Sequence, residues 1–97
     1  MTYQLRVYQV RDGAMEQWVT EWRTVVYPLR LKLGFNVVGA WTVDETNQFV
    51  WIIGYDGPMS FEEAERAYYE SPERVGRDPE PTRHLASTEK HLMASAL

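Results

Sequence analysis

The stretch that decides the fold is FNVVGAWTV at residues 35–43, followed closely by FVWIIGY at residues 49–55. Both runs have the β-branched and aromatic composition of strands. Alternation along a strand gives two faces, and both are apolar in each run. In the first run one face has Phe35, Val37, Trp41 and Val43, and the other has Val38 and Ala40. In the second run one face has Phe49, Trp51, Ile53 and Tyr55, and the other has Val50 and Ile52. Antiparallel sheets usually have one solvated face. We therefore expect helices to cover one face and a second copy of the chain to cover the other.

The elements before this stretch follow from periodicity and turn residues. Residues 2–10 alternate as a strand, and the turn at residues 11–13 follows it. Apolar residues then recur every three or four positions over about residues 14–33, which predicts an amphipathic helix. Pro28 should kink or divide this helix, and Gly34 should end it.

The elements after the stretch are shorter. Ser60 begins a capping box that predicts a helix over residues 61–70, and Pro72 should end that helix. Residues 73–83, ERVGRDPEPTR, are polar and contain glycine and prolines, so we expect a loop. Residues 88–94 are expected to form a fourth strand beside the first.

The order of elements is β-α-β-β-α-β. With right-handed crossovers, this order predicts an α+β, ferredoxin-like fold, with a four-stranded antiparallel sheet and both helices on one face. The fourth strand should lie beside the first, and the third between the first and the second. Residues 1–97 are expected to form a single domain.

Composition excludes several classes of function. A net charge of −4 argues against a nucleic-acid partner, which requires a basic surface. The absence of cysteine excludes disulfides, thiol catalysis and thiolate metal sites. No apolar run approaches the ~20 residues that cross a bilayer, and residue 2 already begins a strand rather than a signal peptide. We expect a cytoplasmic protein without a membrane partner.

An ordered set of short segments resembles the NIPSNAP-like family. The segments are YQLRVY (3–8), Gly13, YPLR (27–30), GFNVVGAW (34–41) and WIIGY (51–55). The resemblance implies a dimeric α+β barrel, in which the sheets of a homodimer face each other. The resemblance implies little about activity, because the wider superfamily of dimeric α+β barrels includes cofactor-free monooxygenases, haem-degrading enzymes, isomerases and cyclases. The chain departs from the family at Gln4, where an acidic residue is usual, and at residues 78–81, where the family tends to continue helically.

Aromatic residues are the first candidates for a site. Five could line a pocket between sheet and helices: Trp18, Trp22, Trp41, Trp51 and Tyr68. Core packing explains the same spacing more simply. Tyr27, beside Pro28, and the pair Tyr68 and Tyr69 are candidate polar groups at a pocket mouth, because a phenol can orient or protonate a substrate oxygen.

The polar candidates lie on the outer strands. His84 and His91 are seven residues apart, too far for a usual metal-ligand spacing, and no metal site is expected. His91 is a candidate catalytic residue, although a partly buried structural histidine is the simpler interpretation. If the fourth strand pairs residue 89 with residue 6, Arg6 and Glu89 form a cross-strand ion pair on the dimer-facing side, near His91.

Two functional hypotheses remain from the sequence. One is a cofactor-free enzyme of monooxygenase, isomerase or cyclase type that acts on a hydrophobic or aromatic metabolite. The other is a non-catalytic module that binds a ligand or a protein. A pocket of several hundred Å³ with convergent polar groups would favour the enzyme, and a filled interior would favour the module. Haem degradation is a further alternative, and no other cofactor is expected.

Overall fold

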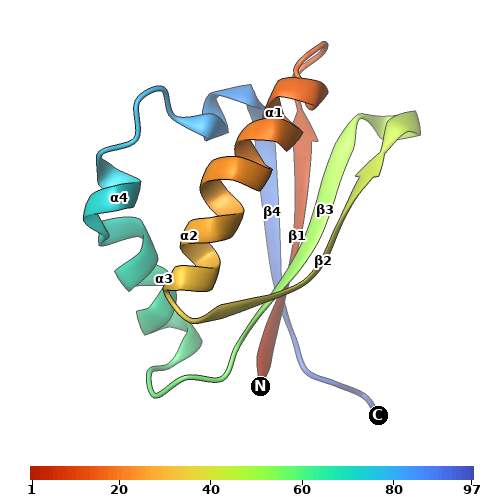
Figure 1. Ribbon diagram of the computed structural model, residues 1–97. Helices are drawn as coiled ribbons and strands as arrows, with labels where there is room; N and C mark the ends of the chain where they lie inside the picture. The colour runs from red at the N-terminus through yellow and green to blue at the C-terminus, as the bar shows by residue number, and fades with distance from the viewer.

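The computed structural model describes residues 1–97 as one sheet covered on one face by helices (Figure 1). The elements are β1 (Thr2–Val10), α1 (Met15–Glu21), the π-helical turn η1 (Trp22–Val26), α2 (Tyr27–Lys32), β2 (Phe35–Val43), η2 (Asp44–Thr46), β3 (Gln48–Tyr55), α3 (Phe61–Glu70), α4 (Pro72–Val75), η3 (Pro81–His84) and β4 (Leu85–Met93). The strands are antiparallel in the order β2-β3-β1-β4. The predicted α+β, ferredoxin-like βαββαβ fold is confirmed.

The core lies between the sheet and the helices. Along β1, every second residue from Gln4 to Val10 is buried on the helix side. The apolar core consists of Tyr8, Val10, Trp18, Trp22, Val26, Leu29, Phe35, Phe49, Trp51, Ile53, Tyr55, Ala64, Tyr68 and Leu85. Two polar residues of β1, Gln4 and Arg6, are buried in the same layer as the apolar core.

The first helical segment passes from α1 through η1 to α2 as a single rod (Figure 1). The π-helical turn η1 ends at Val26, two residues before Pro28. Because proline has no N–H to donate and its ring crowds the carbonyl of the preceding turn, a widened turn accommodates it within the rod. Gly34 follows the helix with φ 91°, a conformation that favours glycine at a helix end.

A β-bulge at Val38 changes the faces of β2. Opposite β3, Val37 pairs with Ile53, but Gly39 rather than Val38 pairs with Ile52. The extra residue reverses the alternation for the rest of the strand. The expectation that Trp41 and Val43 share a face with Phe35 and Val37 is therefore wrong.

Trp41 lies on the sheet face that the helices do not cover. Ala40 pairs with the buried Trp51, whereas Trp41 pairs with Val50 and is 51% exposed. Its ring folds back over Gly39, where a Cβ atom would come within 2.5 Å of the ring. The glycine thus provides the space that the indole occupies.

The C-terminal half differs from expectation in its details. The Ser60 hydroxyl accepts a hydrogen bond from the Glu63 N–H (3.1 Å), which confirms the predicted start of α3. Pro72 follows the end of α3 but also begins α4, because Ser71 caps a second short helix. The expected loop at residues 73–83 therefore contains part of α4 and the start of η3, and β4 begins earlier than predicted, at Leu85.

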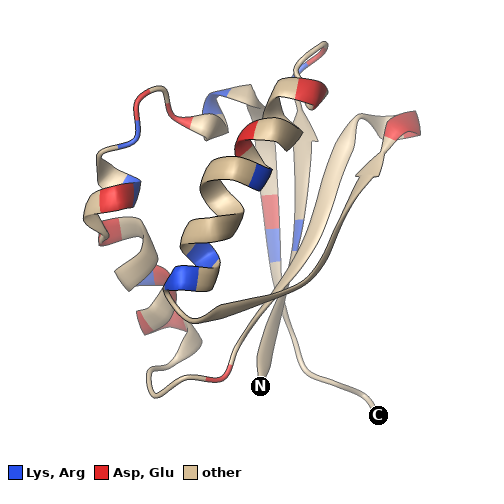
Figure 2. Ribbon diagram, in the orientation of Figure 1, with Lys and Arg blue, Asp and Glu red and all other residues tan.

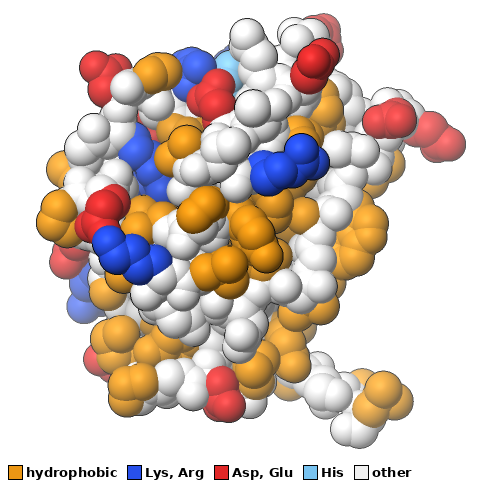
Figure 3. Space-filling model, viewed as in Figure 1, with side chains coloured by type: hydrophobic (Ala, Val, Ile, Leu, Met, Phe, Trp, Pro, Cys, Tyr) orange, Lys and Arg blue, Asp and Glu red, His pale blue; other side chains and the backbone are white.

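The sheet face opposite the helices is apolar and uncovered. Its central residues are the half-buried Leu5, Val7, Val50 and Ile52. Apolar side chains run along the sheet side of the molecule (Figure 3). None of the helices combines the length and the apolar composition that a membrane crossing requires.

Candidate functional site

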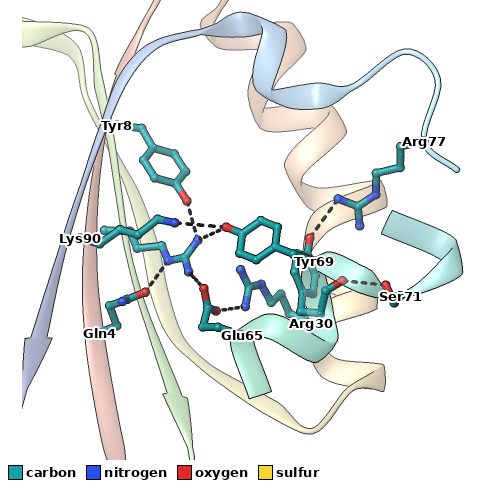
Figure 4. Close-up of polar contacts among 10 residues, drawn as sticks. Gln4, Tyr8, Arg30, Glu65, Tyr69, Ser71, Arg77 and Lys90 are labelled. Atoms are coloured by element: carbon teal, nitrogen blue, oxygen red, sulfur yellow. Dashed lines mark hydrogen bonds and ion pairs between the residues drawn. The ribbon is translucent and has the colours of Figure 1, made fainter. Parts of the chain in front are cut away.

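A largely buried polar cluster links β1 to the helices (Figure 4). Arg6 is its centre, and Tyr69 is its exposed member. The Arg6 guanidinium is 1% exposed and donates from Nε to Gln4 Oε1 at 2.8 Å. Its Nη1 donates to two phenol oxygens, Tyr8 at 3.0 Å and Tyr69 at 3.2 Å. Its Nη2 donates to Glu65 Oε2 at 2.5 Å. All the hydrogen bonds that the Arg6 side chain donates are thus accepted by other side chains and none by the backbone.

Arg30 of α2 approaches the same carboxylate from the other side. Its Nη1 donates to the second oxygen of Glu65, and the residue is 1% exposed. The guanidinium carbon also lies 3.6 Å from the ring centroid of Tyr68 and 4.7 Å from that of Phe35, within the range of cation–π attraction. Two buried cations therefore share one carboxylate. We call Gln4, Arg6, Tyr8, Arg30, Glu65 and Tyr69 the arginine–tyrosine cluster.

Further basic residues lie around this cluster. Figure 2 shows basic residues at a similar level on β1, β4 and α2. Lys90 of β4 is directly opposite Arg6, and its Nζ donates to the Tyr69 oxygen at 3.3 Å. Arg77 follows α4, and its two Nη groups donate to the Tyr68 hydroxyl at 2.9 Å and to the Val25 carbonyl at 3.2 Å. Neither Lys90 nor Arg77 is paired with a carboxylate.

The cluster moves the pKa values of its two phenols in opposite directions. Burial raises the pKa of Tyr8 above 10, although Arg6 opposes the rise. Burial would also raise the pKa of Tyr69, but the cations Arg6 and Arg30 together outweigh it, so that pKa lies below its ordinary value. Burial would lower the pKa of Arg6, but the contacts with Tyr8, Tyr69 and Glu65 raise it. Groups with separated pKa values around one charge are typical of acid–base sites.

A cavity of about 30 Å³ adjoins the cluster. Its wall includes Arg6, Tyr8, Trp18, Arg30, Trp51 and Tyr69 on the inner side. Its outer side is formed by Arg74, Arg77, Glu80 and Thr82, which lie between α3 and β4 in the sequence. Two hollows of about 480 and about 310 Å³ on the helix surface contain no residue of the cluster.

The aromatic candidates separate into three groups. Trp18, Trp51 and Tyr68 are buried and reach the cavity wall. Trp22 is buried without reaching the cavity, and its ring stacks on Tyr27 at 5.2 Å. Trp41, by contrast, lies on the opposite face of the sheet, because the bulge at Val38 reverses the alternation of β2. The prediction that Trp41 lines a pocket between sheet and helices is therefore wrong. A catalytic role of Tyr27, outside the cavity wall, stays a prediction.

The predicted ion pair between Arg6 and Glu89 is wrong. The register between β1 and β4 pairs Arg6 with Lys90 and Val7 with Glu89. A difference of one residue in register moves a side chain to the other face of the sheet, so Arg6 faces the helices and Glu89 faces away. Glu89 Oε2 lies instead 3.4 Å from Nε2 of His91, which is exposed on the same outer face. His91 is thus separated from the cluster by the sheet, and its catalytic role stays a prediction.

Two central residues of the cluster were not identified from the sequence. They are Glu65 and Arg30, whose charged side chains are of a type that usually lies on the solvated face of a helix. Each lies four residues after an inward apolar residue, Glu65 after Phe61 and Arg30 after Val26. A charged residue four positions after an inward apolar residue lies on the same face of the helix. This spacing is the sequence signal that points to Glu65 and Arg30.

The side chains show no cluster of metal ligands and no cavity of the size of a haem. No three His, Asp or Glu residues come together in a way that could hold a metal ion. His84 is buried, and its Nε2 lies 2.9 Å from Oε2 of Glu21. Neither histidine lines the cavity of about 30 Å³, which is far smaller than a haem. The residues of the interior therefore do not fit haem.

Comparison with known proteins agrees with the resemblance noted from the sequence. The family model described as NIPSNAP matches residues 3–96. An uncharacterized NIPSNAP domain protein from Burkholderia xenovorans has a similar structure, with a TM-score of 0.85, 17% identity and coverage of 99% of this chain and 95% of that chain. A NIPSNAP family protein from Agrobacterium tumefaciens has a TM-score of 0.84 and 18% identity, with coverage of 96% of this chain and 90% of that chain. No protein with a curated description matches.

Structures of another description share the fold. One described as a putative antibiotic biosynthesis monooxygenase from Nitrosomonas europaea has a TM-score of 0.72 and 14% identity, with full coverage of both chains (100% and 100%). At this identity the likeness concerns the fold alone.

Proposed function

This chain belongs to the NIPSNAP family, and we propose that it is a homodimeric barrel that acts as a cofactor-free enzyme on a small hydrophobic or aromatic molecule at the arginine–tyrosine cluster. The observation that carries this proposal is the pair of phenols, Tyr8 and Tyr69, bonded to one buried guanidinium with pKa values shifted in opposite directions. The monooxygenase description of the Nitrosomonas europaea structure is consistent with a reaction of this class.

The chemistry proposed for the cluster is proton transfer. A lowered pKa gives Tyr69 a larger phenolate fraction than an ordinary tyrosine, so its oxygen can accept a proton from an acidic C–H or O–H group of the substrate. From an O–H group the electron pair stays on that oxygen, and from a C–H group next to a carbonyl it moves to the carbonyl oxygen. In either case this substrate oxygen would face the guanidinium of Arg6. A buried cation stabilises such a developing oxyanion strongly, because water does not screen it. Monooxygenase, isomerase and cyclase reactions can all begin with this step.

The homodimer is proposed from the uncovered sheet face. Leu5, Val7, Val50 and Ile52 form an apolar centre there, and the exposed Trp41 lies beside it. Contiguous apolar patches on a small protein usually mark an interface. A second sheet packed against this face would bury it, as the barrel architecture of the family implies.

The size of the cavity favours a second candidate function, a non-catalytic binding module. About 30 Å³ suffices for a water molecule or a small polar group but not for an aromatic metabolite. A larger substrate would require the outer wall at residues 74–82 to move. A protein with a filled interior can still bind the polar end of a ligand there without converting it.

Native mass spectrometry followed by a turnover assay tests both candidates. The protein is purified from its own host cells, and its mass is measured without denaturation to find a dimer and any retained molecule. That molecule is then incubated with the wild type, with Tyr69→Phe and with Tyr3→Phe, a control on the outer face. Conversion by the wild type and Tyr3→Phe, but not by Tyr69→Phe, is expected for the enzyme. A retained molecule that none of the proteins converts would support the binding module instead.

A further inference from the structure

We infer that the cavity beside the arginine–tyrosine cluster binds the carboxylate group of a small organic molecule. This inference names the ligand class of the site in the proposed function and rests on its location there. It does not depend on catalysis, because a carboxylate can bind whether or not the protein converts it.

The first observation is an excess of positive charge around the cavity. Four arginines line it: Arg6, Arg30, Arg74 and Arg77. Arg6 and Arg30 share the single carboxylate of Glu65, and Arg74 is paired with Glu80 at 2.7 Å. Arg77 donates only to neutral oxygens. Buried charges are usually paired, but one carboxylate balances only one of the two buried guanidinium groups, Arg6 and Arg30, and the partly exposed Arg77 adds a further unbalanced charge at the same cavity.

The second observation is a set of hydrogen-bond donors without acceptors. Four buried donors have no hydrogen-bond partner among the protein atoms: the Nε group of Arg30 and the indole N–H groups of Trp18, Trp22 and Trp51. Trp22 lies away from the cavity, whereas Trp18, Arg30 and Trp51 all line it. An unsatisfied buried donor costs about 1–3 kcal/mol, so three residues with such donors in one cavity wall favour an acceptor there.

The chemistry of the acceptor follows from the donors. A water molecule would bring two donors of its own into a wall that is already rich in N–H groups. A carboxylate only accepts, offers about four lone pairs and matches guanidinium groups geometrically. With about 30 Å³ available, a single planar carboxylate fits better than a bulkier tetrahedral anion. The rest of the molecule would extend past Arg74 and Arg77 toward solvent.

Acetate is the probe that tests this inference, with three comparison solutes at matched ionic strength. Acetamide has the same shape without the charge, chloride has charge without two oxygens, and phosphate is a tetrahedral anion. Binding is followed on the ¹⁵N-labelled protein through the indole N–H signals of Trp18 and Trp51 and the Nε–H signal of Arg30. The indole signal of Trp41, on the other face of the sheet, is the internal control.

Acetate is expected to shift the signals of Trp18, Trp51 and Arg30 in a saturable way and to leave Trp41 unchanged, whereas acetamide and chloride should not. Arg77→Gln should weaken acetate binding by about tenfold or more, as expected for the loss of a charge-assisted contact. Arg66→Gln removes the same charge from the exposed face of α3, where Arg66 meets only Glu62, and should have no effect.

Three results would overturn the inference. The first is the absence of a saturable shift with acetate, and the second is a shift of equal size with acetate and with chloride. The third is a protein that binds phosphate but does not bind acetate. Acetate binding by a protein that converts no ligand would leave the inference standing and would count against the proposed catalysis alone. Arg77 is partly exposed and outside the core, so a folded Arg77→Gln protein is expected, and circular dichroism checks it.

Discussion

Arg6 of β1 and Glu65 of α3 are joined by a contact of 2.5 Å between Nη2 and Oε2, although 59 residues separate them in the sequence. The contact ties the central part of the sheet to the helix layer. Since Arg30 of α2 binds the other oxygen of the same carboxylate, three elements meet at Glu65. A charged group, rather than an apolar one, thus connects the two layers at this point.

Replacing Glu65 should destabilise the protein strongly. Glu65→Gln leaves the guanidinium groups of Arg6 and Arg30 buried without an anion, and breaking a buried pair in this way costs about 3–5 kcal/mol in the free energy of unfolding. Urea denaturation measures the change. Glu62→Gln, one turn earlier on the exposed side of α3, should alter that free energy by no more than about 0.5 kcal/mol. Similar losses for both variants would contradict the central role of Glu65.

The two phenols of the cluster should titrate apart. Because the pKa of Tyr69 is lowered and that of Tyr8 is raised, Tyr69→Phe should remove an early step from the near-ultraviolet tyrosinate titration, and Tyr8→Phe a late one. A lowered folded-state pKa also makes the ionisation of Tyr69 contribute stability as the pH rises from that pKa toward 10, and this contribution disappears as the pH falls. Loss of the same step in both variants would refute this assignment.

Glu21 gives a second test of pH dependence at the acidic end. A hydrogen bond from Arg83 is the main cause of its lowered pKa, burial opposes the lowering, and a hydrogen bond from His84 adds to it. The stability that this carboxylate contributes should be complete above its ordinary pKa of 4.5 and lost as the pH falls through the lowered value. Glu21→Gln should therefore lower Tm at neutral pH but not in strong acid. The neutral-pH effect should stay within about 1 kcal/mol, since the pair is partly exposed. Glu16→Gln, on the same helix, serves as the control.

The uncovered sheet face can be tested with two neighbouring residues. Trp41→Glu places a charge on the apolar outer face and should convert the proposed dimer to a monomer, as measured by sedimentation velocity. Thr42→Glu places the same charge one residue along, on the other side of the sheet, and should leave the dimer intact. If Trp41→Glu remained dimeric, another surface would have to form the interface.

Gln4 offers a test of the carboxylate inference from within the protein. Gln4 Oε1 lies 2.8 Å from the Nε atom of Arg6, so Gln4→Glu would introduce a carboxylate beside the buried cations. This internal carboxylate should reduce the excess charge and weaken acetate binding by about tenfold. Gln17→Glu adds the same charge on the exposed side of α1 and should leave the affinity unchanged. Stronger acetate binding by Gln4→Glu would contradict the charge argument.

The sequence by itself determined the type and order of the elements. Local periodicity distinguished the strands at residues 2–10, 35–43 and 49–55 from the helices, because alternation and the 3.6-residue period depend only on near neighbours. The turn at Gly13 and the cap at Ser60 were recognisable for the same reason. With the handedness of crossovers, this information was enough for the topology of the sheet.

Only the tertiary structure decided the faces and the partners. The bulge at Val38 reversed the direction of Trp41, and a register different by one residue separated Arg6 from Glu89. Register and bulges are set by the packing of whole strands, so no local pattern contains them. The meeting of Arg6, Arg30 and Glu65 likewise required β1, α2 and α3 to be brought together. The candidate site is therefore a property of the folded layers rather than of any one segment.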